Sequence, residues 1–148
     1  MATLFDPQAR DSILRRVGKL APDRKALWGR FKAPEMVCHV SCALRQALGE
    51  LETAPPAGPL SRAPLNWLVI HVVPWPKGKG KSPPEFLATP PTTWDADVSR
   101  LCDLIRRFAD RGPGAVWPPS RVFGRISGRS WGVMEHKHLD HHLRQFGV

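Results

Sequence analysis

Segments of helix-like apolar periodicity alternate along this chain with segments rich in proline and glycine. Apolar residues recur three and four positions apart within four stretches: 7–21, 34–51, 94–111 and 130–146. Such spacing is typical of amphipathic helices that bury one face. No alternating segment with a hairpin turn offers strands for a sheet. The sequence therefore predicts an all-α, antiparallel four-helix bundle with long Pro/Gly-rich loops, formed by residues 1–148 as one domain.

The ends of the expected helices carry local signals. Asp6 followed by proline marks the start of the first helix, and Thr93 and Ser130 are expected to cap the two long helices near the C-terminus. The run 65–73 is ambiguous, because its β-branched residues suit a strand. A lone strand would have no partner, so we expect a short extra helix that ends at Pro74.

Neither a targeting segment nor a membrane span is evident. The residues that follow Met1 lack the pattern of a signal peptide. The longest apolar run, 65–73, is much shorter than the roughly 20 residues that cross a bilayer. We therefore expect a cytoplasmic protein without membrane contact. The sequence is compatible with a monomer and with a homodimer.

The net charge of +9 is large for 148 residues. Part of it is concentrated at 77–81, and part in Arg121, Arg125 and Arg129. Such a surface attracts nucleic acid or anionic small molecules. The chain has no tyrosine, and its tryptophans are scattered rather than interleaved with arginine as a stacking platform. We therefore expect a small-molecule substrate of anionic character rather than nucleic acid.

Four of the six histidines lie within residues 136–142. On a helix of about 3.6 residues per turn, His138 and His142 are stacked neighbours and can aim at one point. His39 lies on the apolar stripe of the second helix. Three imidazoles buried together each need a partner, because an unpaired polar group in a core costs about 1–3 kcal/mol. A metal ion would satisfy all three.

Other readings of the histidines and cysteines remain open at this stage. The three inward histidines could be core residues satisfied by protein groups, without a metal. His136 and His141 are expected to face solvent, and His71 to be structural or exposed. Three cysteines, an odd number, are expected to be buried thiols rather than disulfides: Cys38, Cys42 and Cys102. Cys42 lies three residues from His39 and could approach the same site.

Near the C-terminus, residues 137–146 read Lys-His-Leu-Asp-His-His-Leu-Arg-Gln-Phe. This segment is similar to the Lys-His-x-x-His-His-x-Arg-Gln-Phe ending of a branch of the DinB-like superfamily of helical bundles. Further matches are Leu27-Trp28-Gly29, Met36-x-x-His39, Pro76-Lys77-Gly78, Phe123-Gly124 and Trp131-Gly132. After the last histidine, many DinB-like chains have Arg-Gly-Gln where this one has Leu-Arg-Gln. The resemblance covers nearly the whole chain.

The resemblance implies a four-helix bundle that holds a divalent metal through His39, His138 and His142. Imidazoles accept several ions, of which zinc or nickel is expected first and iron or manganese next. Several relatives are thiol-dependent transferases or isomerases, and others are metal-dependent hydrolases. The family thus implies a low-molecular-weight thiol as a further cofactor.

Two reactions and a non-catalytic role fit these expectations. In a transferase, the open position of a three-histidine site binds a thiolate that attacks an electrophile. In a hydrolase it holds an activated water, which usually needs a carboxylate base nearby. Glu135 and Asp140 are expected on other faces of the last helix, so the transferase is favoured slightly. The third reading is a basic module that binds nucleic acid or protein.

Overall fold

Five α-helices and two short 3-10 helices form the regular structure of the computed structural model, which describes residues 1–148. The α-helices are α1 (Pro7–Val17), α2 (Ala33–Leu48), α3 (Leu65–His71), α4 (Trp94–Arg111) and α5 (Gly128–Gln145), and the 3-10 helices are η1 (Pro59–Ser61) and η2 (Pro84–Phe86). β-Pairing is limited to one isolated bridge between Ser120 and Gly124. The prediction of an all-α chain is confirmed, including the short helix that begins at residue 65.

The helix caps agree with the sequence signals only in part, since Thr93 occupies the N-cap position of α4 but its side chain makes no capping hydrogen bond. Asp6 caps α1, since its carboxylate accepts a hydrogen bond of 3.0 Å from the backbone N–H of Gln8. Ser127 caps α5, because its hydroxyl accepts from the N–H of Ser130 at 3.1 Å. The prediction that Ser130 is this cap is therefore wrong. Its hydroxyl lies 3.0 Å from Nε2 of His71 instead.

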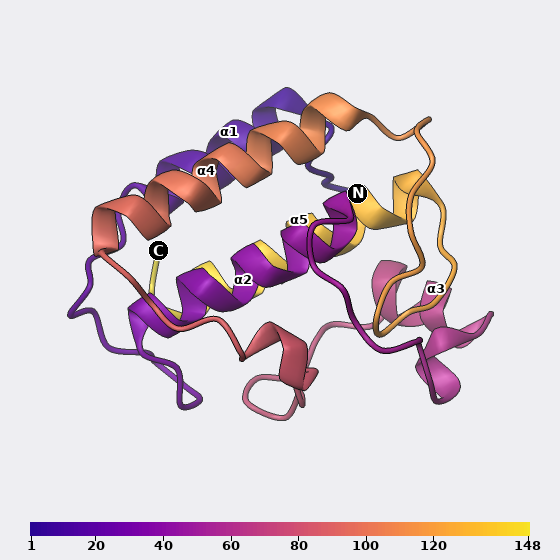
Figure 1. Ribbon diagram of the computed structural model, residues 1–148, viewed down its shortest axis with the longest axis horizontal. Coiled ribbons are helices and arrows are strands. Elements are labelled where there is room, and N and C mark those ends of the chain that lie inside the picture. Colours follow the sequence, from indigo (N-terminus) through magenta and orange to yellow (C-terminus); the bar gives the residue numbers. More distant parts are fainter.

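The four long helices lie in two layers, α1 with α4 and α2 with α5 (Figure 1). Within each layer the helices run in opposite directions. Between the layers, α1 runs the same way as α5, and α2 the same way as α4 (Figure 1). Cys38 lies against Asp97 near the starts of α2 and α4, and Arg111 bonds the carbonyl of Leu48 near their ends.

This arrangement does not confirm the expected antiparallel bundle. The connection from α2 to α4, residues 49–93, is long enough to carry the chain back to the end from which α2 started. Long crossover connections of this kind allow parallel neighbours, whereas short loops force antiparallel ones. The length of this Pro/Gly-rich segment therefore decides the relative directions of the helices.

One apolar core joins all five α-helices. The buried side chains of Trp131, Phe108 and Ile70 belong to it, together with stripes from α1 and α2. Phe86 is buried, whereas the adjacent Leu87 is 53% exposed. The 3-10 turn directs the two side chains apart. No helix has both the length and the apolar character needed to cross a bilayer.

Candidate metal centre

Three histidines from two helices meet at one point inside the protein. His39 comes from α2, and His138 and His142 come from successive turns of α5. One ligand nitrogen from each lies within 4.8 Å of the other two, and Nε2 of His39 is 3.0 Å from Nε2 of His138. The three side chains are nearly closed off from solvent, with exposed fractions of 4%, 9% and 8%. The three residues that the sequence singles out are thus brought together and could hold a metal ion.

The outer nitrogens of two of these rings are bonded to protein carbonyls. Nδ1 of His39 lies 3.3 Å from the carbonyl oxygen of Phe86, and Nδ1 of His142 lies 2.8 Å from Oε1 of Gln145. A carbonyl oxygen only accepts hydrogen bonds, so each Nδ1 carries the proton. Nε2 of each ring is left with a lone pair directed at the shared point, which is the form in which imidazole binds a metal.

The third ring has a carboxylate at its outer nitrogen. Nδ1 of His138 is 3.7 Å from Oε2 of Glu135, whose side chain is fully buried. Neither carboxyl oxygen of Glu135 has a hydrogen-bond partner, and desolvation raises its pKa to about 8. The prediction that Glu135 lies on another face is wrong, because residues three apart on a helix are neighbours. The spacing Glu-x-x-His on the buried stripe was the signal in the sequence.

Burial keeps the three imidazoles neutral. Desolvation, with a smaller contribution from His138, lowers the pKa of His39 to about 3. Desolvation also lowers the pKa of His138 to about 4, and together with the neighbouring histidines it lowers that of His142 well below its ordinary value. Neutral rings at physiological pH are ready to coordinate a metal without first losing a proton.

These pKa shifts predict how the stability of the metal-free protein depends on pH. Below about pH 6.5 the histidines bind protons in the unfolded chain but stay neutral in the folded protein. The free energy of unfolding therefore falls as the pH falls toward 4. Each histidine contributes a slope of about 1.4 kcal/mol per pH unit in this window, and Glu135, whose pKa is raised to about 8, offsets about one histidine. Urea unfolding between pH 7 and pH 5 measures it. The slope should be shallower in His39→Leu, and an unchanged slope would contradict the assignment.

A glycine turn holds Gln145, the partner of His142. Nε2 of Gln145 donates to the backbone carbonyl of Trp28 at 2.8 Å. The backbone carbonyl of Gln145 in turn accepts from the backbone N–H of Leu27 at 2.7 Å. Gly29 follows with φ of +77°, and a Cβ there would lie 2.5 Å from the Gln145 amide nitrogen. The Leu-Trp-Gly motif thus positions the amide that orients His142.

Gly29→Ala is therefore expected to cost both stability and metal affinity. The left-handed backbone alone costs a non-glycine residue about 1–2 kcal/mol, and the contact with Gln145 adds to this. Gly49→Ala is the matched control, since Gly49 has φ of +80° and nothing within 4 Å of a Cβ. Thermal unfolding and metal titration should show a stability loss in both variants but weaker metal binding only in Gly29→Ala. Equal metal affinity in the two variants would exclude this role for the turn.

Aromatic side chains from two loops cover the histidines. Phe31 stacks on His39 with ring centroids 4.9 Å apart and meets His142 edge-on at 5.6 Å. Trp75 lies 5.9 Å from the ring of His138. Neither aromatic residue carried a signal in the sequence, because loop conformation alone brings them here. Their rings pack against those of the three histidines.

The remaining histidines and Cys42 lie outside the group of three. His141 packs against His142, with ring centroids 5.3 Å apart, and His136 is also half-buried, so the expectation that both face solvent is wrong. His71 is half-buried and bonds Ser130. Cys42 bonds Thr89 instead of approaching the site. All three cysteines are free thiols.

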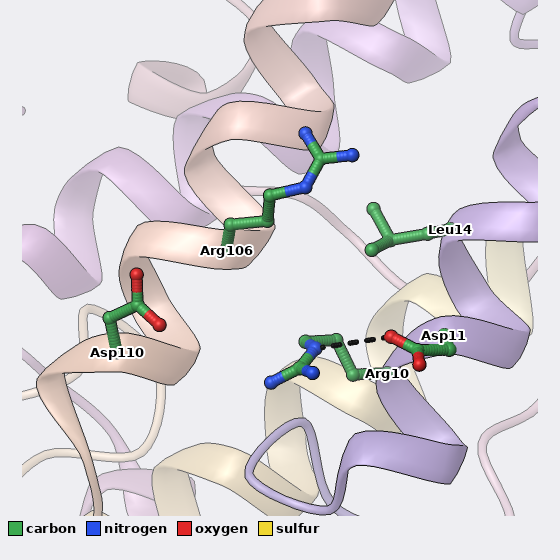
Figure 2. A pocket seen from close by; sticks show the side chains of 5 residues that line it. All are labelled: Arg10, Asp11, Leu14, Arg106 and Asp110. Atoms are coloured by element: carbon green, nitrogen blue, oxygen red, sulfur yellow. Dashed lines mark hydrogen bonds and ion pairs between the residues drawn. The ribbon is translucent and has the colours of Figure 1, made fainter.

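A surface hollow between α1 and α4 is unrelated to this centre. It has a volume of about 210 Å³ and is lined by charged side chains of both signs, with Arg10 bonded to Asp11 on the same helix (Figure 2). Arg106 and Asp110 of α4 face them (Figure 2). No histidine lines it.

Comparison of the chain with family models, with curated proteins and with solved structures finds no match in any of the three.

Proposed function

We propose that His39, His138 and His142 bind one divalent metal ion and that the protein is a metal-dependent enzyme, most simply a thiol-dependent S-transferase. The observation that carries the proposal is the arrangement of the ring nitrogens. Each outer nitrogen faces a protein acceptor, while the inner nitrogens meet within 4.8 Å. Core histidines satisfied by protein groups alone have no need for three inner nitrogens at one point.

The donor set supports a borderline ion. Two inner nitrogens, on His39 and His138, lie 3.0 Å apart, and without an ion they must share a proton. Imidazole ligands suit zinc and nickel best, with iron and manganese as alternatives. Three protein ligands leave a coordination position free, which is the mark of a catalytic rather than a structural site.

The charges around the centre favour an anion at the free position. Three neutral imidazoles bring no charge, and Glu135 can bring one negative charge, so a divalent ion would remain under-compensated in a buried site. When bound, the ion would supply Lewis acidity that stabilises a thiolate at neutral pH. Phe31 and Trp75 would exclude water from that thiolate and so preserve its reactivity toward an electrophile.

The carboxylates favour transfer over hydrolysis. Glu135 lies at Nδ1 of His138, on the side of the ring away from the inner nitrogen. Asp140 is held by Arg16 at 2.7 Å and by Arg144 at 2.9 Å. Neither is placed to take a proton from a water at the free position, and a thiolate needs no such base. The DinB-like bundle, the cytoplasmic location and a small anionic substrate belong to the same proposal.

Cobalt-substituted protein tests the proposal. Thiolate binding to Co(II) produces an intense near-ultraviolet charge-transfer band, so glutathione, cysteine and N-acetylcysteine are titrated as probes. Thiol consumption with 1-chloro-2,4-dinitrobenzene is then followed for the zinc and nickel forms. A thiol-dependent band together with turnover absent from His142→Ala is the expected result. Metal binding without either signal would exclude the transferase.

A further inference from the structure

The rim of the histidine centre carries a lysine that has no acidic partner. Nζ of Lys77 lies 4.7 Å above the ring of Trp28. The salt bridges of the protein engage arginines such as Arg121 and Arg144, whereas Lys77 forms none. A cation stacked on an indole is held in place by the ring, yet its charge remains available to an anion.

The same tryptophan presents an unused hydrogen-bond donor. Nε1 of Trp28 is buried and has no acceptor. A buried indole N–H is normally hydrogen-bonded. Because no group of the protein accepts from Trp28 Nε1, a bound ligand could supply the acceptor. Trp28 thus combines a lysine ammonium over its ring with a buried N–H that lacks an acceptor.

These two groups lie next to the histidine centre. The ring of Trp28 is 5.9 Å from that of His141, which in turn is 5.3 Å from the ring of His142. The backbone carbonyl of Trp28 also accepts from Gln145, the side chain that orients His142. Lys77 and Trp28 are thus separated from the histidine centre by one ring, that of His141.

We propose that Lys77 and the indole N–H of Trp28 form an anion subsite that takes a carboxylate of the ligand whose other end occupies the histidine centre. The subsite rests on the proposed metal centre and defines its substrate class, namely ligands that carry a carboxylate besides the metal-binding group. Lys79 and Lys81 of the same loop lie in solvent without an aromatic support.

Two hydroxamates that differ by one carboxylate test the subsite. Acetohydroxamate and succinic monohydroxamate are titrated into the Co(II) protein, and their dissociation constants are read from the visible bands. Wild type is expected to favour the carboxylated probe at least about tenfold, as a charge-assisted hydrogen bond provides. Lys77→Gln and Trp28→Phe should each reduce this preference, since the first removes the charge and the second removes the N–H together with part of the aromatic ring. Lys79→Gln is the matched control and should keep it.

The outcomes separate the subsite from the metal centre. Equal affinity for both probes in wild type, or the same preference in Lys77→Gln and Lys79→Gln, would overturn the subsite while the metal centre stands. Failure to bind cobalt at all would overturn the metal centre and the subsite with it. A preference kept with hydroxamates when no thiol band forms would leave the subsite standing and exclude only the thiol.

Discussion

Metal content is expected to fall from about one ion per chain to near zero when His142 is replaced by alanine. The substitution removes one of three inner nitrogens and leaves the Oε1 of Gln145 without its donor. Two imidazoles on different helices would hold a divalent ion too weakly to retain it through gel filtration. His39→Ala and His138→Ala should behave alike, because each removes one of the three nitrogens that would bind the ion.

The matched control for this loss is His136→Ala. His136 lies on the same helix and is half-buried, but it is not one of the three converging residues. Elemental analysis by mass spectrometry after metal reconstitution measures the content, with circular dichroism to establish that each variant is helical. Full metal retention in a folded His142→Ala protein would refute the ligand assignment.

Replacing Glu135 with methionine is expected to change metal affinity and stability in opposite directions. The carboxyl is fully buried with both oxygens unpartnered, so removing it should raise the unfolding free energy of the metal-free protein by about 1–3 kcal/mol. The same change deprives His138 of the carboxylate at its outer nitrogen. Loss of such a partner typically weakens metal binding 10–100-fold.

Competition with a chelator gives the affinity, and urea unfolding of metal-free protein gives the stability. Glu52→Gln is the control, since Glu52 is exposed and should leave both quantities unchanged. A Glu135→Met protein that is less stable without metal would show that the carboxyl has a structural partner. Unchanged metal affinity would show that it does not support His138.

The helices were predictable because their signals are local. Apolar spacing defined α4, and the same spacing placed His39, His138 and His142 on inward faces. The relative directions of the helices depend on the crossover at residues 49–93, where proline and glycine indicate a loop but not its path. Helix spacing indicated the group of three histidines for that reason, whereas the bundle topology was not accessible from the sequence.

Around the histidines, too, local features could be predicted from the sequence and tertiary contacts could not. Glu135 was within reach of sequence reasoning, because its position three residues before His138 follows from helix geometry. Phe31 and Trp75 reach the centre from loops, and Lys77 lies over Trp28, in positions that depend on tertiary contacts and follow from no spacing rule. Prediction therefore succeeded for the convergence of His39, His138 and His142, but it failed for Glu135 and His141 on α5 and for the aromatic side chains supplied by the connections.

The converging histidines of α2 and α5 are far apart along the chain, since His39 and His138 are separated by 99 positions. An ion bound between them would be a reversible cross-link between distant parts of the polypeptide. Cross-links that close loops of about 100 residues restrict the unfolded chain by up to roughly 4–5 kcal/mol in chain-entropy terms. Metal supply would then govern how long each molecule survives proteolysis, so that in metal-poor cells the protein would be lost by turnover as well as by inactivity.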